Sequence, residues 1–345
     1  MINTALVSFG MSGKLFHAPF IESNPNFNLV GSWERSTKNI EAAYPGTKSY
    51  TSYEELLSDP TIDLVIVNTP NDTHFAYTKS ALLAGKHVVC EKAFTITSVE
   101  AQALEELAQK KGLQLAVYQN RRYDADFLTL QKLINEGEIG DLLDIQISFE
   151  RYRTNLSPKA HKEAVTPGAG LLYDLGPHLV DQAILLSGMP LAVFADIRIT
   201  RKVSLVDDYF TMILYYPTHR ITLTSGMVFM TQLPGYKVYG SKGSFIKNRS
   251  DIQETKLIAG EKPNSSNWGE EAEADYGTLY TDHNGLITNR VVTSVPGNYG
   301  LFYEKMADAI LNNRPVPTSA QEGKNIIRVL EAARNSAFNK RVVGI

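Results

Sequence analysis

Cysteine is almost absent from this sequence of 345 residues: Cys90 is the single example, so no intrachain disulfide can form. A chain without disulfides fits a reducing compartment, and we expect a cytoplasmic protein. Cys90 ends the apolar run His87-Val88-Val89-Cys90, which predicts the end of a buried strand. We therefore interpret its thiol as a structural group and not as a nucleophile.

The sequence also lacks an excess of either charge and any long apolar stretch. The net charge of −3 gives no electrostatic basis for binding nucleic acid or an anionic membrane. No segment approaches the ~18 apolar residues of a membrane span, and Met1-Ile2-Asn3 leads into the short run Ala5-Leu6-Val7 without a signal-peptide pattern. We expect a small molecule as the partner and predict no metal site.

What the sequence has is a regular alternation of short apolar strands with helices in its first third. A chain of this length favours two domains. Repeated strand–helix units predict a doubly wound parallel sheet of the Rossmann type, with ligands at the carboxyl ends of the strands. Strands are expected at residues 4–9, 28–33, 47–50, 63–67, 87–90 and 113–118, and helices at 13–23, 36–44, 52–58, 73–84 and 97–111.

A glycine-containing turn, Ser8-Phe9-Gly10-Met11-Ser12-Gly13, follows the first expected strand. Such a turn lets a pyrophosphate approach the backbone N–H groups at a helix N-terminus. We therefore predict cofactor contacts from Phe9, Gly10, Met11, Ser12 and Gly13. Ser8 stands at the first glycine of the G-x-G-x-x-G fingerprint, so the pattern alone is weak, and a turn without a ligand explains it almost as well.

An acidic residue ends the second expected strand, roughly 20 residues after the fingerprint, where dinucleotide-binding domains bind the adenosine ribose. Glu34 could accept hydrogen bonds from the ribose diol of NAD, whereas Arg35 could hold the 2′-phosphate of NADP. A solvated charged turn is the alternative for Arg35. Both cofactors remain open at this point.

Polar residues follow the next two parallel strands. Thr69, Pro70, Asn71 and His74 come after residues 63–67, and Glu91-Lys92 after residues 87–90. Because these strand ends meet at one edge of the sheet, we expect all of them, together with Asn120 at the domain junction, to bind the cofactor. Lys92 could also stabilise a developing alkoxide, although a lysine after a strand is more often a solvated surface charge.

The pattern changes after residue 120, where we place the domain boundary. Residues 1–120 are expected to bind the cofactor, and residues 121–345 the substrate and other subunits. Leu143, Ile145, Ile147 and Phe149 alternate with polar residues, which indicates a half-buried strand. Similar strands at 192–200, 207–216, 219–229 and 235–240, a hairpin around Asn284-Gly285, and helices at 124–136, 299–312 and 320–338 predict an α/β domain with a mainly antiparallel open sheet.

The stretch Tyr173–Asp181 predicts a loop that leads directly into a helix. Pro177 suits a first helical position, and His178 would then lie in the first turn, where the helix dipole favours the neutral imidazole that a general base needs. Asp174 is close enough in sequence to orient that ring. The alternative is that Asp174 caps the helix and His178 is a surface residue.

Taken together, these segments resemble the Gfo/Idh/MocA family, named for glucose–fructose oxidoreductase and inositol dehydrogenase. The likeness covers essentially the whole chain, and it is strongest to the branch that contains NADP-dependent scyllo-inositol dehydrogenases. Its carriers are Ser8–Gly13 with Phe16-His17-Ala18-Pro19, Asn68–His74, Ala84–Lys92, Tyr118–Thr129, Tyr173–His178 and Asp208-Tyr209-Phe210.

The resemblance implies an NAD(P)-dependent dehydrogenase of a cyclic polyol or sugar, assembled as a homodimer or homotetramer through its C-terminal sheet. It also implies that Lys92, Asp174 and His178 match the family's catalytic lysine, aspartate and histidine. Ala93 stands where the family has proline, so the Lys92–Ala93 peptide bond could be trans or cis. Two alternatives are an NAD-dependent glycosidase that oxidises its substrate transiently and a non-enzymatic cofactor sensor, which would not need the complete catalytic set.

Overall fold

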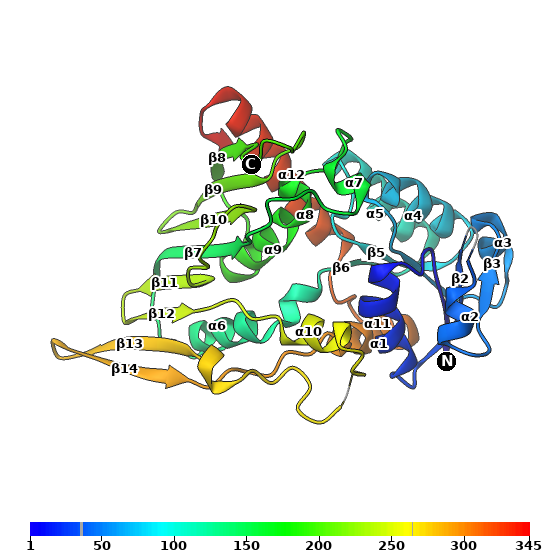
Figure 1. Ribbon diagram of the computed structural model, residues 1–345, viewed down its shortest axis with the longest axis horizontal. Coiled ribbons are helices and arrows are strands. Elements are labelled where there is room, and N and C mark those ends of the chain that lie inside the picture. Colours follow the sequence, from blue (N-terminus) through cyan, green and yellow to red (C-terminus); the bar gives the residue numbers. More distant parts are fainter. Residues whose placement is uncertain (35–36, 264) are drawn as a thin grey trace. The chain divides into compact units, whose positions relative to one another are not determined.

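A computed structural model describes residues 1–34, 37–263 and 265–345 of the chain (Figure 1). These residues form two compact units. The first contains Met1–Asn120, Gln253–Trp268 and Tyr299–Lys324, and the second contains Arg121–Ile252, Gly269–Asn298 and Asn325–Ile345. Two segments from the C-terminal half of the chain thus belong to the first unit. The division into a cofactor-binding and a substrate-binding domain at residue 120 stays a prediction.

The first unit is built on a six-stranded sheet in the order β3-β2-β1-β4-β5-β6, in which all neighbouring strands are parallel. This order confirms the predicted doubly wound sheet. The strands are β1 (Ile2–Leu6), β2 (Phe27–Trp33), β3 (Lys48–Tyr50), β4 (Leu64–Val67), β5 (His87–Glu91) and β6 (Leu115–Tyr118). All four residues of β4 are fully buried, as expected for a central strand with helices on both faces.

Helices connect these strands, and Figure 1 shows α4 and α5 side by side. Helix α5 begins with a capping box, in which Thr97 Oγ1 accepts from the Glu100 N–H over 3.2 Å and Glu100 Oε2 accepts from the Thr97 N–H over 3.1 Å. The helices are α1 (Ala18–Glu22), α2 (Asn39–Ala43), α3 (Tyr53–Ser58), α4 (His74–Leu83), α5 (Ser98–Lys111) and α11 (Gly300–Asn312), with a π-helical turn at Gly13–His17 and a 3-10 turn at Asn71–Thr73.

Two predicted boundaries near the N-terminus are wrong. The first strand ends at Leu6 and not at Phe9, although Val7 and Phe9 are buried. The expected first helix divides into the π-helical turn and α1, with Pro19 in the first turn of α1. Buried side chains in the turn continued the apolar pattern of the strand, so hydrophobicity alone placed its end too late.

The second unit contains a nine-stranded sheet in the order β14-β13-β12-β11-β7-β10-β9-β8-β15 (Figure 1). Strands β7 and β10 are parallel and the other neighbours are antiparallel, which confirms the mainly antiparallel sheet. The strands are β7 (Leu142–Glu150), β8 (Ala192–Arg198), β9 (Tyr209–Tyr215), β10 (Arg220–Gly226), β11 (Tyr236–Gly240), β12 (Gly243–Lys247), β13 (Gly277–His283), β14 (Leu286–Val292) and β15 (Val343–Gly344).

The helices of this unit include α6 (Ala125–Asn135), α7 (Ala160–Glu163), α8 (Leu171–Asp174) and α9 (Gly176–Ser187), of which α9 packs on β7 and β10. Helices α10 (Ile252–Ile258) and α12 (Ala320–Asn339) have residues in both units. The sequence did not predict β12, β15, α7, α8 or α10. None of the helices formed by the described residues has both the length and the apolar character that a membrane crossing requires.

Candidate active site

In the first unit, the turn after β1 is joined to the end of β4 by two hydrogen bonds. The Ser8 N–H donates to Asn68 Oδ1 over 2.9 Å, and Asn68 Nδ2 donates to the Ser8 carbonyl over 2.7 Å. A Cβ atom on Gly13 would lie 2.4 Å from that carbonyl oxygen, so a side chain does not fit where the helical turn meets the strand. The turn is therefore tight although Ser8 stands where the fingerprint has glycine.

Glu91 joins the end of β5 to the same turn. Its Oε1 accepts a hydrogen bond from Ser12 Oγ and lies 3.0 Å from His17 Nε2, and its Oε2 accepts from the Lys92 N–H over 3.2 Å. His17 is fully buried, with Nδ1 2.6 Å from the Tyr303 hydroxyl of α11. Burial opposes ionisation of Glu91, but the contacts with His17 and Ser12 prevail and lower its pKa to about 2. Glu91 is thus a half-buried carboxylate that fixes the turn against β5.

His74 joins the ends of β4 and β5. The ring is fully buried, and its Nδ1 and Nε2 lie 2.7 Å from the Ala93 carbonyl oxygen and 2.8 Å from the Thr69 carbonyl oxygen. Both partners can only accept, so the ring donates twice as an imidazolium. Burial favours the neutral ring, but the Cys90 sulfur and the two carbonyls raise the pKa of His74 to about 9. The ring connects two strand-end loops, and a contact with a cofactor stays a prediction.

The strand ends of β1, β4 and β5 therefore form one connected group, as their positions in the parallel sheet led us to expect. Lys92 follows β5 directly and is half-buried, and its peptide bond to Ala93 is cis. The other residues predicted to bind a cofactor here differ in their exposure to solvent. Gly10 and Met11 are exposed, Ser12, Thr69, Pro70 and Asn71 are partly exposed, and Phe9, Gly13 and Asn120 are buried.

Glu34, the predicted ribose ligand, is directed into the chain. Its carboxylate is 9% exposed and accepts hydrogen bonds at the start of α2 and from β3. The donors are Thr37 Oγ1, Ser49 Oγ and the N–H groups of Asn39 and Ile40. This carboxylate stabilises the N-terminus of α2, and hydrogen bonding to a ribose stays a prediction. Arg35, the predicted phosphate ligand, lies outside the described residues.

In the second unit, His178 lies in the first turn of α9 and is 5% exposed, so it is not the surface residue of the alternative interpretation. The residues three and four positions further along share its face of the helix. Asp181 accepts two hydrogen bonds from the Arg122 guanidinium, over 2.8 Å and 2.6 Å. Gln182 donates to the Arg121 carbonyl over 3.2 Å and accepts from the Tyr236 hydroxyl over 3.1 Å. These contacts fix the part of α9 that carries His178.

Asp174 ends the short helix α8 and does not lie in a loop, as the sequence had suggested. Nor is it the capping residue of α9: that position is Leu175, whose side chain makes no capping hydrogen bond. Asp174 Oδ1 instead accepts a hydrogen bond from Lys162 Nζ over 2.7 Å. The capping interpretation is therefore wrong. The loop before α8 is tied at Leu171, whose N–H donates to the Asp207 carbonyl over 2.7 Å.

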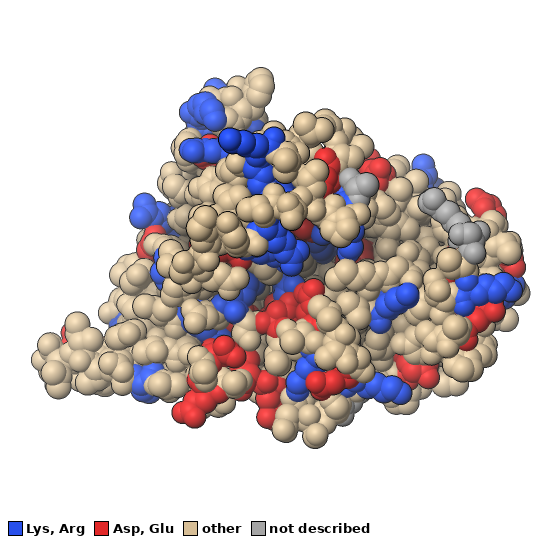
Figure 2. Space-filling model, viewed as in Figure 1, with Lys and Arg blue, Asp and Glu red and all other residues tan. Residues whose placement is uncertain are grey.

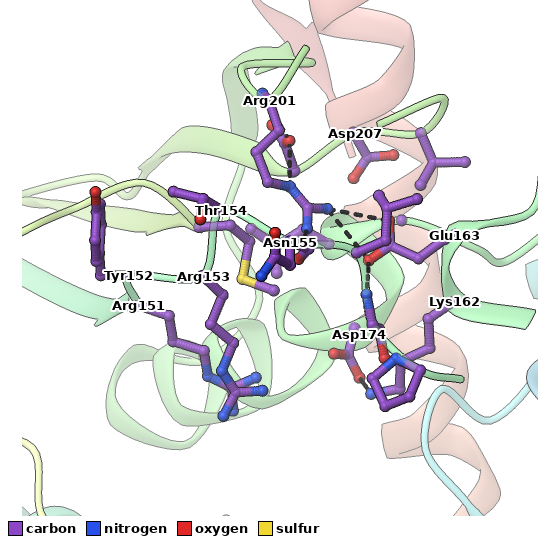
Figure 3. A pocket seen from close by; sticks show the side chains of 18 residues that line it. Arg151, Tyr152, Arg153, Thr154, Asn155, Lys162, Glu163, Asp174, Arg201 and Asp207 are labelled. Carbon is purple, nitrogen blue, oxygen red and sulfur yellow. Dashed lines mark hydrogen bonds and ion pairs between the residues drawn. The ribbon is translucent and has the colours of Figure 1, made fainter. Parts of the chain in front are cut away.

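A cavity of about 380 Å³ lies next to Asp174 within the second unit (Figure 3). Its wall is formed by residues 151–158 after β7, by α7 and α8, and by the loops around Arg201 and Asp207. Arg201 is buried and pairs with Glu163 over 3.0 Å and with Asp208 over 2.8 Å. The wall combines charged side chains of both signs with apolar side chains such as Leu156 and Val206, and its charged groups can hydrogen-bond the hydroxyl groups of a ligand.

Sequence reasoning missed several residues of these networks. Three of them contact predicted segments: Asn68 bonds to the turn at Ser8, His17 contacts Glu91, and Lys162 bonds to Asp174. The fourth is Arg201, which pairs with Asp208 in the cavity wall. Asn68 and His17 belong to segments that carry the family resemblance, so their place in those motifs was the available signal. Lys162 and Arg201 had no such signal, because they lie outside these motifs and their partners belong to other segments of the fold. Of the predicted catalytic residues, Lys92 belongs to the first unit and Asp174 and His178 to the second.

Comparisons with known proteins match both halves of the chain. Residues 2–119 match the description "Oxidoreductase family, NAD-binding Rossmann fold", and residues 131–345 match "Oxidoreductase family, C-terminal alpha/beta domain". The scyllo-inositol 2-dehydrogenase (NADP(+)) IolW of Bacillus subtilis is 37% identical over 342 residues, which cover 99% of this chain and 95% of that protein.

Two solved structures have the same fold over the whole chain. The YvaA protein from Bacillus subtilis superposes with a TM-score of 0.97 at 37% identity, covering 100% of this chain and 98% of the other. A protein from Bacteroides fragilis superposes with a TM-score of 0.91 at 43% identity, covering 100% of both chains.

Proposed function

Because this chain belongs to the Gfo/Idh/MocA oxidoreductase family, we propose that it transfers a hydride between a hydroxyl-bearing carbon of a cyclic polyol or sugar and NADP or NAD. It is an NAD(P)-dependent dehydrogenase with a Rossmann domain. The substrate class is the part that we infer. It is supported by the name of the inositol dehydrogenase relative and by the charged side chains that line the cavity beside Asp174.

The observation that carries the proposal is the connected group of strand ends in the first unit. The Glu91 carboxylate accepts hydrogen bonds from Ser12 of the glycine-containing turn and from the Lys92 N–H. The predicted cofactor turn and the predicted catalytic lysine are therefore fixed to each other. The absence of a side chain at Gly13 lets the helical turn pack closely against the Ser8 carbonyl, which is the role of the third glycine in a dinucleotide-binding fingerprint. These residues fit a dinucleotide, which supplies the hydride acceptor when it is bound.

The catalytic residues would then have distinct roles. His178, held by the Asp181 and Gln182 contacts of α9, would take the proton of the reacting hydroxyl. Lys92 would position that hydroxyl and stabilise the developing negative charge on its oxygen. Asp174 would tune the charge near His178, together with its partner Lys162.

We further propose that NADP is preferred over NAD. A carboxylate presented to the ribose would repel a 2′-phosphate, whereas the Glu34 carboxylate is buried and already bonded to the start of α2. Parallel titrations of the two dinucleotides test this preference, and tighter binding of NAD would overturn it.

An initial-rate screen tests the proposed function. The purified protein is mixed with NADP or NAD and with scyllo-inositol, myo-inositol, glucose or xylose, and absorbance at 340 nm is followed. Net accumulation of reduced cofactor supports the dehydrogenase. A hydrolysed glycoside without net reduction would indicate a glycosidase instead, and tight cofactor binding without turnover of any substrate would indicate a sensor.

A further inference from the structure

Two arginines lie on one side of the extended segment that follows β7 and lines the cavity. The Arg151 N–H donates to the Gly226 carbonyl over 3.0 Å, and the Arg153 N–H donates to the Met227 carbonyl over 2.7 Å. Tyr152 between them forms an antiparallel bridge with Val228. In an extended segment the side chains of alternate residues point the same way. Figure 3 shows both arginine side chains running in the same direction along the cavity.

The carboxylates of the cavity wall already have partners from the chain. Asp174 pairs with Lys162 over 2.7 Å. Glu163 and Asp208 both pair with Arg201. The side chain of Asp207 accepts from the Leu172 N–H over 2.7 Å and lies 4.0 Å from the Arg334 guanidinium. Among the described residues, each carboxylate of the cavity wall is therefore already engaged by a donor or a cation of the chain.

Arg153 is exposed and, within the described part of the chain, its guanidinium has no hydrogen-bond acceptor or acidic partner. Arg151 lies over the Phe149 ring at 4.8 Å, and the guanidinium groups of Arg249 and Arg121 lie 4.6 Å and 5.1 Å from the same ring. Figure 2 shows Lys and Arg side chains gathered over the second unit, around the position of α8 and α9 in Figure 1. Arg121 is itself paired with Asp124 and Asp251, and the segment after β7 contributes two cationic side chains, Arg151 and Arg153, to the cavity wall.

We propose that the substrate is a polyol or sugar that carries an anionic group, a carboxylate or a phosphate ester, and that Arg151 and Arg153 bind this group. Guanidinium groups bind such oxyanions through paired, charge-assisted hydrogen bonds. The hydroxyl groups of the substrate would face the side of the cavity that Asp174 and Lys162 form. This inference rests on the proposed function, and it narrows the substrate class.

Matched substrates test the inference by activity. Glucose, glucuronate and glucose 6-phosphate have the same ring and differ in charge, so kcat/KM should be higher for at least one anion than for glucose by about 10-fold or more. Arg153→Gln should lower kcat/KM for that anion by about 10- to 100-fold, mainly through KM, and lower kcat/KM for glucose by a much smaller factor. The glucuronate and phosphate arms identify which anion is bound. Arg328→Gln is the matched control, because Arg328 is exposed on α12 and does not line the cavity.

Calorimetry separates failure of this inference from failure of the proposed function. With saturating NADP, glucuronate and inorganic phosphate are titrated into the wild-type protein and the Arg153→Gln variant. Binding of either anion to the wild type that weakens in the variant supports the arginine site even if no substrate is turned over. Equal binding by both proteins, or a higher kcat/KM for glucose than for either anion, would overturn the inference and leave the dehydrogenase proposal standing.

Discussion

Glu91 Oε1 lies 3.0 Å from His17 Nε2, and this contact links the end of β5 to the first helical turn after the glycine-containing turn. The same carboxylate accepts a hydrogen bond from Ser12 Oγ. Residues that are distant in sequence therefore share one half-buried acceptor, and cofactor binding should depend on it.

Replacement of Glu91 should weaken cofactor binding and should reduce the dependence of the free energy of unfolding on acid pH. The pKa of Glu91 is lowered to about 2 in the folded protein, so its stabilising effect is present above an unfolded pKa of about 4.3 and is lost as pH falls toward 2. Between these two pKa values, Glu91 should contribute a slope of about 1.4 kcal/mol per pH unit to the free energy of unfolding. This contribution should be absent in Glu91→Gln. Urea unfolding between pH 3 and 6 measures it, with the exposed Glu54→Gln as control. Identical pH slopes for wild type and Glu91→Gln would contradict this account.

His74 should affect stability at the opposite end of the pH range. Its pKa is raised to about 9, so the stabilisation is fully present below the unfolded value of about 6.5 and is lost as pH rises through 9. Wild-type stability should fall by about 1.4 kcal/mol per pH unit between these values from this group alone, and the fall should be absent in His74→Gln. Denaturant melts from pH 6 to 10 check the slope. The exposed His283→Gln should behave as the wild type does, and a wild-type slope in His74→Gln would mean that the ring is neutral.

His178→Ala should lower turnover by roughly 10²–10⁴, the usual contribution of general acid–base catalysis, because the proton acceptor is lost. Cofactor affinity should stay near the wild-type value, since His178 belongs to the second unit and the predicted cofactor turn to the first. Steady-state rates and a cofactor titration on the same preparation separate the two effects. Near-normal turnover would remove His178 from the mechanism.

Lys92→Met keeps most of the side-chain length and removes the charge, so damage to packing should be small. Loss of one preorganised electrostatic donor typically lowers turnover by ~10²–10³, and we expect an effect of this size with a much smaller change in cofactor affinity. The test compares single-turnover rates at saturating cofactor. A variant that binds cofactor and turns over as the wild type does would make Lys92 a bystander.

The parallel sheet could be predicted because each strand buries a continuous apolar run, as Leu64–Val67 does. Strand β12 was missed because it begins with glycine and contains Lys247, whose side chain is fully buried. Burial of that lysine depends on Glu271, with which it pairs. Such a partner becomes visible only when the chain is folded.

The candidate site shows the same limit. The positions of Gly13, Lys92 and His178 followed from local motifs, which a single stretch of sequence contains. The side chains that hold them do not follow from local patterns, because Glu91 meets His17, and Arg122 meets Asp181, across many intervening residues. The capping alternative for Asp174 failed for this reason: it considered only the helix that follows in sequence, whereas the folded chain brings Lys162 to the carboxylate.

The measurement that tests the central claim most directly is the fate of the transferred hydrogen. The polyol or sugar that gives the highest rate in the screen is prepared with deuterium on its ring carbons, and the reaction with NADP is followed by NMR. The account predicts that one deuterium appears at nicotinamide C4 for each ketone or lactone formed. Unlabelled cofactor recovered beside an oxidised or hydrolysed product would contradict direct hydride transfer, and with it the proposed function.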